Sequence, residues 1–158
     1  MSEKVKLTWN GKQIEAVKGS NLLQAALDNG EKVAHYCYHA GLSIAGVCRM
    51  CMVEQDGVPR PFPSCNATCG EGMVVRNDTP KIKAAVEATL QFHLLNHPLD
   101  CPVCDQAGEC GLQDYYMEYG KYDSQMIDKK VHKEKVQDIG KGVMLDAERC
   151  ILCSRCTR

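Results

Sequence analysis

The chain has 158 residues, a formal net charge of −1 and eleven cysteines, but only one tryptophan and two phenylalanines. The near-neutral charge gives no basis for nucleic-acid binding, and no stretch approaches the roughly 20 apolar residues of a membrane span, so a soluble chain is expected. The many cysteines and few aromatic residues indicate that metals or cross-links supply part of the stability.

The cysteines are expected to bind metals in a reducing, cytosol-like compartment. Disulfides need an oxidising compartment, and the N-terminus MSEKVKLTWNGKQIEAV has no apolar signal-peptide segment. An odd number of cysteines also fits a disulfide framework poorly. Zinc and iron–sulfur clusters remain as alternatives.

The first segment predicts a β-hairpin. Apolar residues alternate in VKLTW (5–9), and Asn10-Gly11 is typical of a type I′ turn. A second strand is therefore expected at 12–17.

A short helix is expected next, over 21–30, with Ser20 as its N-cap and Gly30 closing it. Further short strands are predicted at 50–55 and 72–77. Hairpin, helix and then a cysteine-bearing loop is the order of a small ferredoxin-type sheet with one helix packed on it.

A second helix is predicted before Pro98. Asp78 or Thr79 is expected to cap it, and Pro98 ends it, which places His97 at its C-terminal edge. His93, one turn earlier, is interpreted as a packing or hydrogen-bonding residue rather than a ligand. One face of the helix carries apolar residues at every fourth position and is expected to be buried: Ile82, Val86, Leu90 and Leu94.

The remaining third of the chain has weaker signals. The tyrosine-rich stretch 111–122 is expected to be helical, and 123–140 to be a polar linker. The basic run 129–135 is interpreted as a solvated linker face rather than a binding patch. A new unit is expected to begin at about 141.

The first group of candidate ligands begins with Cys37, Cys48 and Cys51, and either Cys65 or Cys69 could complete it. The order is that of plant-type ferredoxins, with a longer first spacer. A zinc ribbon would have two CxxC clips, whereas only one of the pairs here is a clip. The spacing therefore favours a [2Fe–2S] cluster over zinc.

The second group lies in HPLDCPVCDQAGEC, where a histidine precedes three cysteines. Three cysteines cannot complete a tetrahedral zinc site or a four-iron cube, and His97 is the nearest candidate for the fourth ligand. A Cys₃His zinc site has the same composition, so these residues alone leave zinc and iron–sulfur equally open. The group is His97, Cys101, Cys104 and Cys110.

The third group is Cys150, Cys153 and Cys156. The spacing C-x2-C-x2-C opens the bacterial ferredoxin run and suits a four-iron cube better than zinc. The sequence ends two residues after Cys156, before any fourth cysteine. Cys69 could supply that ligand, but a domain has no physical reason to stop after three ligands, so a fragment is expected.

Taken together, the three groups resemble the N-terminal region of the large iron–sulfur subunit (75 kDa type, G-type) of respiratory complex I, the NADH:quinone oxidoreductase. The matching stretches are CYHAGLSIAGVCRMCMVE (37–54), HPLDCPVCDQAGECGLQDYYMEYG (97–120) and ERCILCSRC (148–156). The resemblance covers essentially the whole chain. NAD-reducing and iron-only hydrogenases and some formate dehydrogenases share this module.

The resemblance implies three clusters. It implies a [2Fe–2S] cluster on Cys37, Cys48, Cys51 and Cys65, which leaves Cys69 as a buried structural thiol. It implies a [4Fe–4S] cluster on His97, Cys101, Cys104 and Cys110, with the histidine as ligand. It implies a further [4Fe–4S] cluster on Cys150, Cys153 and Cys156, whose last cysteine lies beyond this chain.

The fold class expected is α+β. A ferredoxin-like β-grasp domain would occupy 1–78, and a mostly helical and loop iron–sulfur domain 79–122. A linker over 123–140 would lead to the incomplete start of a bacterial-ferredoxin-like domain over 141–158.

The resemblance implies an electron-transfer component of an oxidoreductase and translocase. Electrons would arrive from a flavin-bearing NADH-oxidising subunit and leave toward quinone, with other peripheral-arm subunits as partners, at the cytoplasmic face of the inner membrane. No catalytic residues are expected, because no nucleophile–base pair, phosphate loop or nicotinamide fingerprint is found. The alternatives are a hydrogenase or formate dehydrogenase module, or a zinc-stabilised interaction module.

Overall fold

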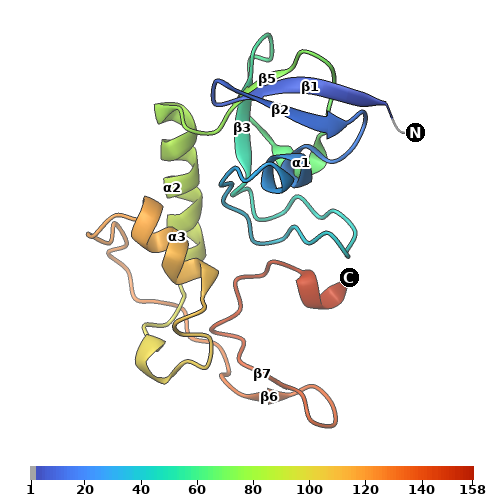
Figure 1. Ribbon diagram of the computed structural model, residues 1–158. Coiled ribbons are helices and arrows are strands. Elements are labelled where there is room, and N and C mark those ends of the chain that lie inside the picture. The colour runs from blue at the N-terminus through green and yellow to red at the C-terminus, as the bar shows by residue number, and fades with distance from the viewer. Residues whose placement is uncertain (1–2) are drawn as a thin grey trace. The chain divides into compact units, whose positions relative to one another are not determined.

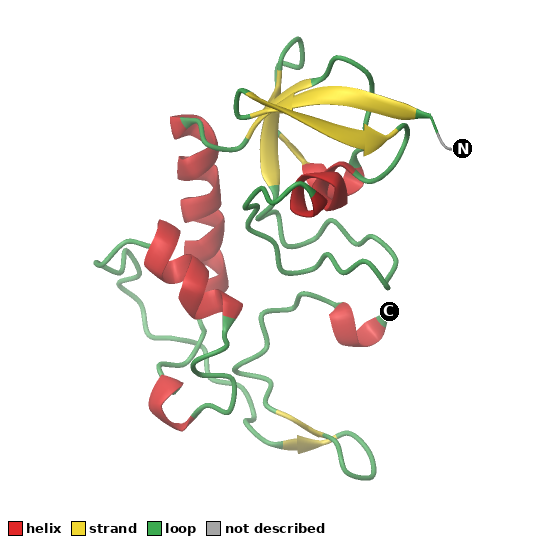
Figure 2. Cartoon of the chain, viewed as in Figure 1, coloured by secondary structure: helices red, strands yellow, loops and turns green. Residues whose placement is uncertain are grey.

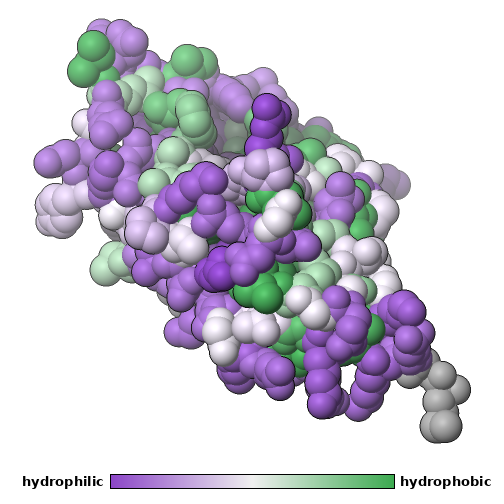
Figure 3. Space-filling view, turned by 90° about the horizontal axis from the view of Figure 1, so that it is seen from above, coloured by the Kyte–Doolittle hydropathy of each residue, from purple (hydrophilic) through white to green (hydrophobic). Residues whose placement is uncertain are grey.

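A computed structural model describes residues 3–158, which form an α+β fold (Figures 1 and 2). The chain divides into two compact units. The first unit runs to Val86 and includes Ser154–Arg158, and the second is Glu87–Cys153. No helix within residues 3–158 is both long and apolar enough to cross a membrane. The face seen in Figure 3 is mostly hydrophilic, with hydrophobic residues in small scattered patches.

The first unit is built on a mixed five-stranded sheet in the order β2-β1-β5-β3-β4. β1 pairs with β2 antiparallel and with β5 parallel, while β3 pairs antiparallel with both β4 and β5. The first and last strands of the sheet in sequence therefore run side by side at its centre. The strands are β1 Lys4–Trp9, β2 Lys12–Val17, β3 Met52–Gln55, β4 Phe62–Pro63 and β5 Val74–Arg76.

The predicted hairpin is confirmed. Asn10 and Gly11 both have positive φ, 47° and 82°, as a type I′ turn requires. The alternation in β1 buries every second residue, and Trp9 at its end is fully buried. Trp9 Nε1 donates a hydrogen bond to Asn77 Oδ1 at 3.2 Å, which satisfies the one polar atom of the indole.

The helix α1, Leu22–Asp28, begins with a cap that differs from the prediction. Asn21 is the N-cap, and its side-chain oxygen accepts from the Gln24 N–H at 3.0 Å. Ser20 was the wrong choice, because its hydroxyl turns back and donates to the Val17 carbonyl at 2.7 Å, closing the turn after β2. The predicted end is confirmed, since Gly30 follows the helix with φ +79°.

The core of the first unit lies between α1 and the sheet. Leu22 and Leu23 from the helix are fully buried against Trp9, Val53 and Val75 from the strands. Three cysteines join the same cluster of buried residues: Cys51, Cys65 and Cys69. The first group of predicted ligands is therefore built onto the core itself.

The long helix α2, Pro80–Leu94, belongs to the first unit up to Val86 and to the second from Glu87. Of the two predicted caps, Thr79 is the one used, since its hydroxyl accepts from the Ile82 N–H at 3.2 Å. The predicted apolar face is confirmed for Ile82, Val86 and Leu90, which are buried, whereas Leu94 is only half-buried. The helix ends just before His97.

The second unit has little regular structure apart from α2. Helix α3, Gly111–Tyr119, confirms the helix expected after Cys110. A small hairpin, β6 Gln137–Asp138 with β7 Met144–Leu145, was not predicted. Three short 3₁₀ helices complete the elements of both units: η1 Ser64–Asn66, η2 Cys101–Val103 and η3 Arg155–Thr157.

Candidate iron–sulfur sites

The four predicted ligands of the first site are all buried, each with at most 3% of its surface exposed. Cys37 and Cys48 lie in the long loop between α1 and β3. Cys51 directly precedes β3, and Cys65 lies in η1, which follows β4. The segment that carries the four cysteines is therefore anchored by α1 before it and by strands of the sheet within and after it.

The four sulfurs form two interacting pairs. The thiol of Cys37 is hydrogen-bonded to that of Cys48, and the thiol of Cys51 to that of Cys65. Within residues 3–158, no three His, Cys, Asp or Glu side chains converge on a point that would hold one metal ion. Two pairs suit a two-iron cluster, in which each iron takes two thiolates, better than a single tetrahedral ion.

Backbone amides already face these sulfurs. The Tyr36 N–H donates to Cys48 Sγ at 3.4 Å. Burial alone would raise the pKa of Cys37, but hydrogen bonds from the Cys48 backbone and thiol and the Val47 backbone outweigh it and lower the pKa. The hydrogen bond with Cys65 lowers the pKa of Cys51 to about 6. Such donors stabilise thiolates, the form that binds iron.

The structure distinguishes Cys65 from Cys69. The Cys65 carbonyl accepts from Asn21 Nδ2 at 2.6 Å, so the residue is tied to the start of α1 while its sulfur meets Cys51. Cys69 is buried in the core, and its thiol contacts the Ser20 side chain instead. Burial of Cys69 is as expected, and the pairing favours Cys65 as the fourth ligand.

The predicted ligands of the second site share one cavity. A cavity of about 1110 Å³ in the second unit is lined by all four, together with apolar residues of α2 and α3. His97 follows α2, Cys101 begins η2, and Cys110 is the residue before α3. Cys101 is exposed and Cys104 and Cys110 are half-buried, in contrast to the buried first site.

His97 has the properties of a metal ligand. Its Nδ1 atom is buried and has no hydrogen-bond partner within residues 3–158. Burial, with the nearby charges of Lys130 and Arg149, lowers the pKa of His97 and favours the neutral imidazole. A neutral imidazole with an unpartnered buried nitrogen fits coordination of a metal, since buried polar atoms otherwise carry a desolvation cost.

The basic run 129–135 is mostly exposed, as expected of a solvated face, but it also contacts the His97 loop. Lys130 Nζ donates to the Leu94 and Leu95 carbonyls at 3.0 Å each, which caps the end of α2. The Val131 N–H donates to Asn96 Oδ1 at 2.9 Å. Sequence reasoning missed these contacts, because no local pattern links positions 35 or 36 residues apart.

A cluster of charged residues also links the segment after Lys130 to the loop that follows His97. Lys135 forms ion pairs with Asp100, next to the predicted ligand Cys101, and with the buried Glu148, at 3.2 Å from Glu148 Oε2. Glu148 also accepts a hydrogen bond at its Oε1 atom from the Lys133 N–H at 3.2 Å and meets His132 Nδ1 at 2.8 Å. These contacts hold in place the residues that directly precede Cys150.

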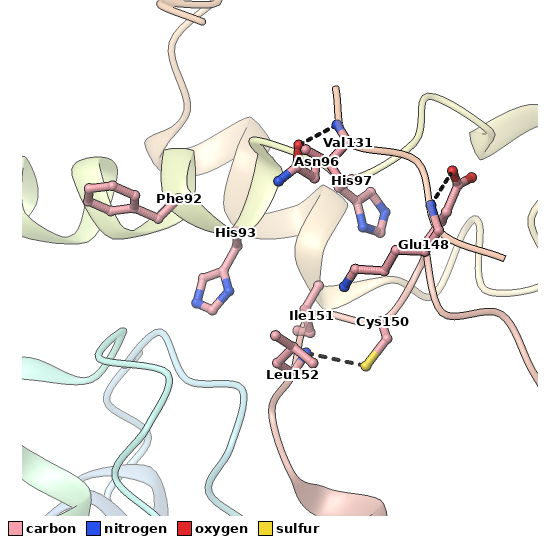
Figure 4. Close-up of a pocket in the computed structure, with 10 residues that line it drawn as sticks. Phe92, His93, Asn96, His97, Val131, Glu148, Cys150, Ile151 and Leu152 are labelled. Carbon is pink, nitrogen blue, oxygen red and sulfur yellow. Dashed lines mark hydrogen bonds between the residues drawn. The ribbon is translucent and has the colours of Figure 1, made fainter. Parts of the chain in front are cut away.

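A smaller cavity of about 140 Å³ lies between the two ligand groups of the second unit. In Figure 4, His93 on the last turn of α2 and His97 just after the helix line this cavity together with the segment that carries Cys150 and Leu152. The Leu152 N–H donates to Cys150 Sγ at 3.4 Å, and the φ of Leu152 is +56°. The third group is divided, with Cys150 and Cys153 in the second unit and Cys156 in the first.

Comparison with known families identifies the first region. Residues 2–80, half of the chain, match the family described as a 2Fe-2S iron-sulfur cluster binding domain. The chain belongs to this family. Residues 87–125 match the NADH-ubiquinone oxidoreductase-G iron-sulfur binding region. The two matches confirm [2Fe–2S] and [4Fe–4S] clusters as cofactors, and neither extends to the third cysteine group.

The relatives confirm the resemblance to complex I. The chain is 45% identical over 156 residues to the G-type subunit of NADH-quinone oxidoreductase from Rickettsia bellii, covering 98% of this chain and 22% of the relative. It is also 45% identical over 156 residues to the mitochondrial 78 kDa subunit of NADH-ubiquinone oxidoreductase from Neurospora crassa, covering 98% and 21%. The chain thus spans about a fifth of the length of these curated relatives.

Among solved structures, the chain is similar to an NAD+-reducing [NiFe]-hydrogenase in the H2-reduced state. The TM-score is 0.86 and the identity 28%, covering 96% of this chain and 64% of that chain. The α+β fold class is confirmed by this similarity, and the hydrogenase module is a related family.

Proposed function

We propose that the chain is the N-terminal electron-transfer part of the G-type subunit of an NADH:quinone oxidoreductase. It would relay electrons from a flavin-bearing NADH-oxidising subunit toward quinone. The observation that carries the proposal is His97, whose unpartnered buried nitrogen belongs to the cavity lined by Cys101, Cys104 and Cys110. The identity to the Rickettsia protein over nearly the whole chain supports the same function.

The protein would act by holding its cofactors rather than by reacting with a substrate. Iron–sulfur clusters supply reversible one-electron transfer. In the first site, buried cysteines exclude water, and N–H donors such as that of Tyr36 stabilise negative sulfur. In the second site, the neutral His97 would contribute a ligand without charge, so that this site carries less negative charge than four thiolates would.

The ligand sets stay as predicted from the sequence. The first would be Cys37, Cys48, Cys51 and Cys65, the second His97, Cys101, Cys104 and Cys110, and the third Cys150, Cys153 and Cys156. The mixed sheet with α1 supports a ferredoxin-like β-grasp domain, for which we propose residues 1–78. The proposed boundaries of the later segments are 79–122, 123–140 and 141–158.

We further propose that other peripheral-arm subunits are the partners, at the cytoplasmic face of the inner membrane. The names of the bacterial relatives, which describe one subunit of an oxidoreductase, support partner subunits for this chain.

Spectroscopy on the anaerobically purified chain tests the cluster sites. Electron transfer requires a brown protein that contains iron and sulfide and gives an EPR signal on reduction. Cys51→Ala should abolish the [2Fe–2S] signal, whereas Cys69→Ala, a substitution of a buried cysteine outside the proposed site, should retain it. A colourless protein containing only zinc would show an interaction module instead.

A hydrogenase module is the second candidate, favoured by the structural similarity described above. Deletion of the gene separates the two. Membranes that lose NADH-dependent quinone reduction support the complex I function, and cells that lose hydrogen-dependent NAD+ reduction support the hydrogenase.

A further inference from the structure

Two arginines from the end of the chain contact the loop that carries Cys37. Arg158 Nη2 donates to the Cys37 carbonyl at 2.6 Å, and its Nη1 donates to the Ser43 carbonyl. Arg155 Nη2 donates to the Tyr38 carbonyl at 2.6 Å. All of these residues belong to the first unit. The short segment 154–158 is therefore fastened to the ligand loop of the first site, although it also carries Cys156.

The guanidinium of Arg158 is held in its orientation by its own segment. Its Nε donates to the Ser154 carbonyl at 2.9 Å. The same carbonyl accepts from the Thr157 hydroxyl at 3.1 Å, and Ser154 has a left-handed backbone with φ 59°. With all three nitrogens bonded, the planar fork bridges Cys37 and Ser43 across the loop.

Arg155 and Arg158 differ from Arg76 of the same unit in the kind of acceptor that they bind. Arg76 makes a two-fold ion pair with Asp56, at 2.6 and 2.9 Å. Within the described chain, no Asp or Glu side chain forms an ion pair with Arg155 or Arg158, and the acceptors named above are uncharged carbonyls. Two arginine side chains that form no ion pair with an Asp or Glu side chain of the described chain thus lie at the backbone of the first ligand loop.

We propose that Arg158, with Arg155, is a positioning residue that fixes the Cys37 loop and stabilises the reduced form of the first cluster. This inference rests on the proposed [2Fe–2S] site. An oxidised [2Fe–2S] core carries 2+, so four thiolates leave the site at 2−, and one-electron reduction takes it to 3−. A nearby positive charge favours the more negative state by Coulomb attraction; the cysteines of the site are buried, whereas Arg158 is half-buried and Arg155 exposed, so solvent screens part of the effect.

A redox titration followed by EPR tests the charge directly. In the purified, cluster-loaded chain, Arg158→Gln should shift the reduction equilibrium of the [2Fe–2S] signal about tenfold toward the oxidised form, about 59 mV for one electron. Arg158→Lys keeps the charge, so its midpoint potential should stay close to that of the wild type. Arg60→Gln, which removes an exposed arginine of the same unit, is the matched control and should leave it unchanged.

Three outcomes are distinguishable. An unshifted midpoint in Arg158→Gln, with the [2Fe–2S] signal intact, would overturn this inference and leave the proposed function standing. A wild-type chain without that signal would overturn both. Equal shifts in Arg158→Gln and Arg158→Lys would assign the effect to loop geometry and refute the charge. Fluorescence of the buried Trp9 checks that each variant retains the fold of the first unit.

Discussion

The first and second ligand sites stand in opposite surroundings. The first has cysteines no more than 3% exposed, set on a core that includes Trp9, Leu22 and Leu23. The second has an exposed Cys101 at the start of the short η2, and apolar residues of its unit such as Leu99 and Met117 are more than 80% exposed. We therefore expect the apolar core of the first unit to support its fold without metal, and the fold of the second unit to depend on what its cavity binds.

Removal of iron should produce the largest difference in stability between the two units. On anaerobic chelation, residues 97–120 should lose amide protection and helical circular dichroism, because few buried apolar side chains hold them. The strands β1 and β2 should keep their protection. Hydrogen exchange read by mass spectrometry measures both regions in one sample. Equal loss in the two regions, or an unchanged spectrum, would contradict the comparison.

Truncation of a core side chain should instead destabilise the first unit and leave the second cluster in place. Leu7→Ala removes a side chain that is 1% exposed in β1 and should cost about 2–5 kcal/mol of unfolding free energy. Urea unfolding followed by Trp9 fluorescence measures it. Val58→Ala, at a position 40% exposed, is the control and should stay within about 0.5 kcal/mol. The signal of the second cluster should persist in native buffer, and its loss in Leu7→Ala alone would mean that the units are not independent.

The ligand type of the second site should show in its potential. His97→Cys replaces a neutral ligand by a thiolate, which makes the site one charge more negative and should lower its midpoint. In Rieske centres, histidine ligands raise the reduction potential of the cluster. We expect a change of about tenfold or more in the reduction equilibrium by EPR titration, with the first cluster unaffected. An unchanged midpoint would show that burial and hydrogen bonds, rather than ligand charge, set the potential.

The smallest effect is expected at the end of α2. Lys130→Met removes the ammonium that donates to Leu94 and Leu95 and should cost about 1 kcal/mol of local stability. Hydrogen exchange of the last turn of α2 measures this cost. Lys129→Met, one residue earlier and exposed, is the matched control. Equal protection in both variants would mean that Lys130 does not hold the His97 loop.

Local signals were predicted well because they act over a few residues. Asn10-Gly11 specifies its turn through positive φ at both positions, and Thr79 caps α2 through its own hydroxyl. The cap of α1 failed because Ser20 and Asn21 are both good caps, and the direction of the incoming chain decides between them. Sequence alone does not carry that direction.

Pairings between distant residues were beyond the sequence. The clip Cys48-x-x-Cys51 is visible in the sequence, but the partner of each thiol is not: each is hydrogen-bonded to a distant cysteine, Cys37 or Cys65. The basic run at 129–135 had no visible target, because the carbonyls that Lys130 reaches become acceptors only once α2 ends. Gly140 and Gly142 did carry a turn signal for the β6–β7 hairpin, but its two-residue strands show no alternation.

Asn21 limits which amino acids this position tolerates. One side-chain atom accepts the Gln24 N–H that starts α1, while the other donates to the carbonyl of Cys65. Serine and aspartate are equally good helix caps, but aspartate has no donor and serine has only one side-chain oxygen for both bonds. A single amide therefore couples the start of a helix to a proposed iron ligand, and an exchange that is conservative for the helix is not conservative for the metal.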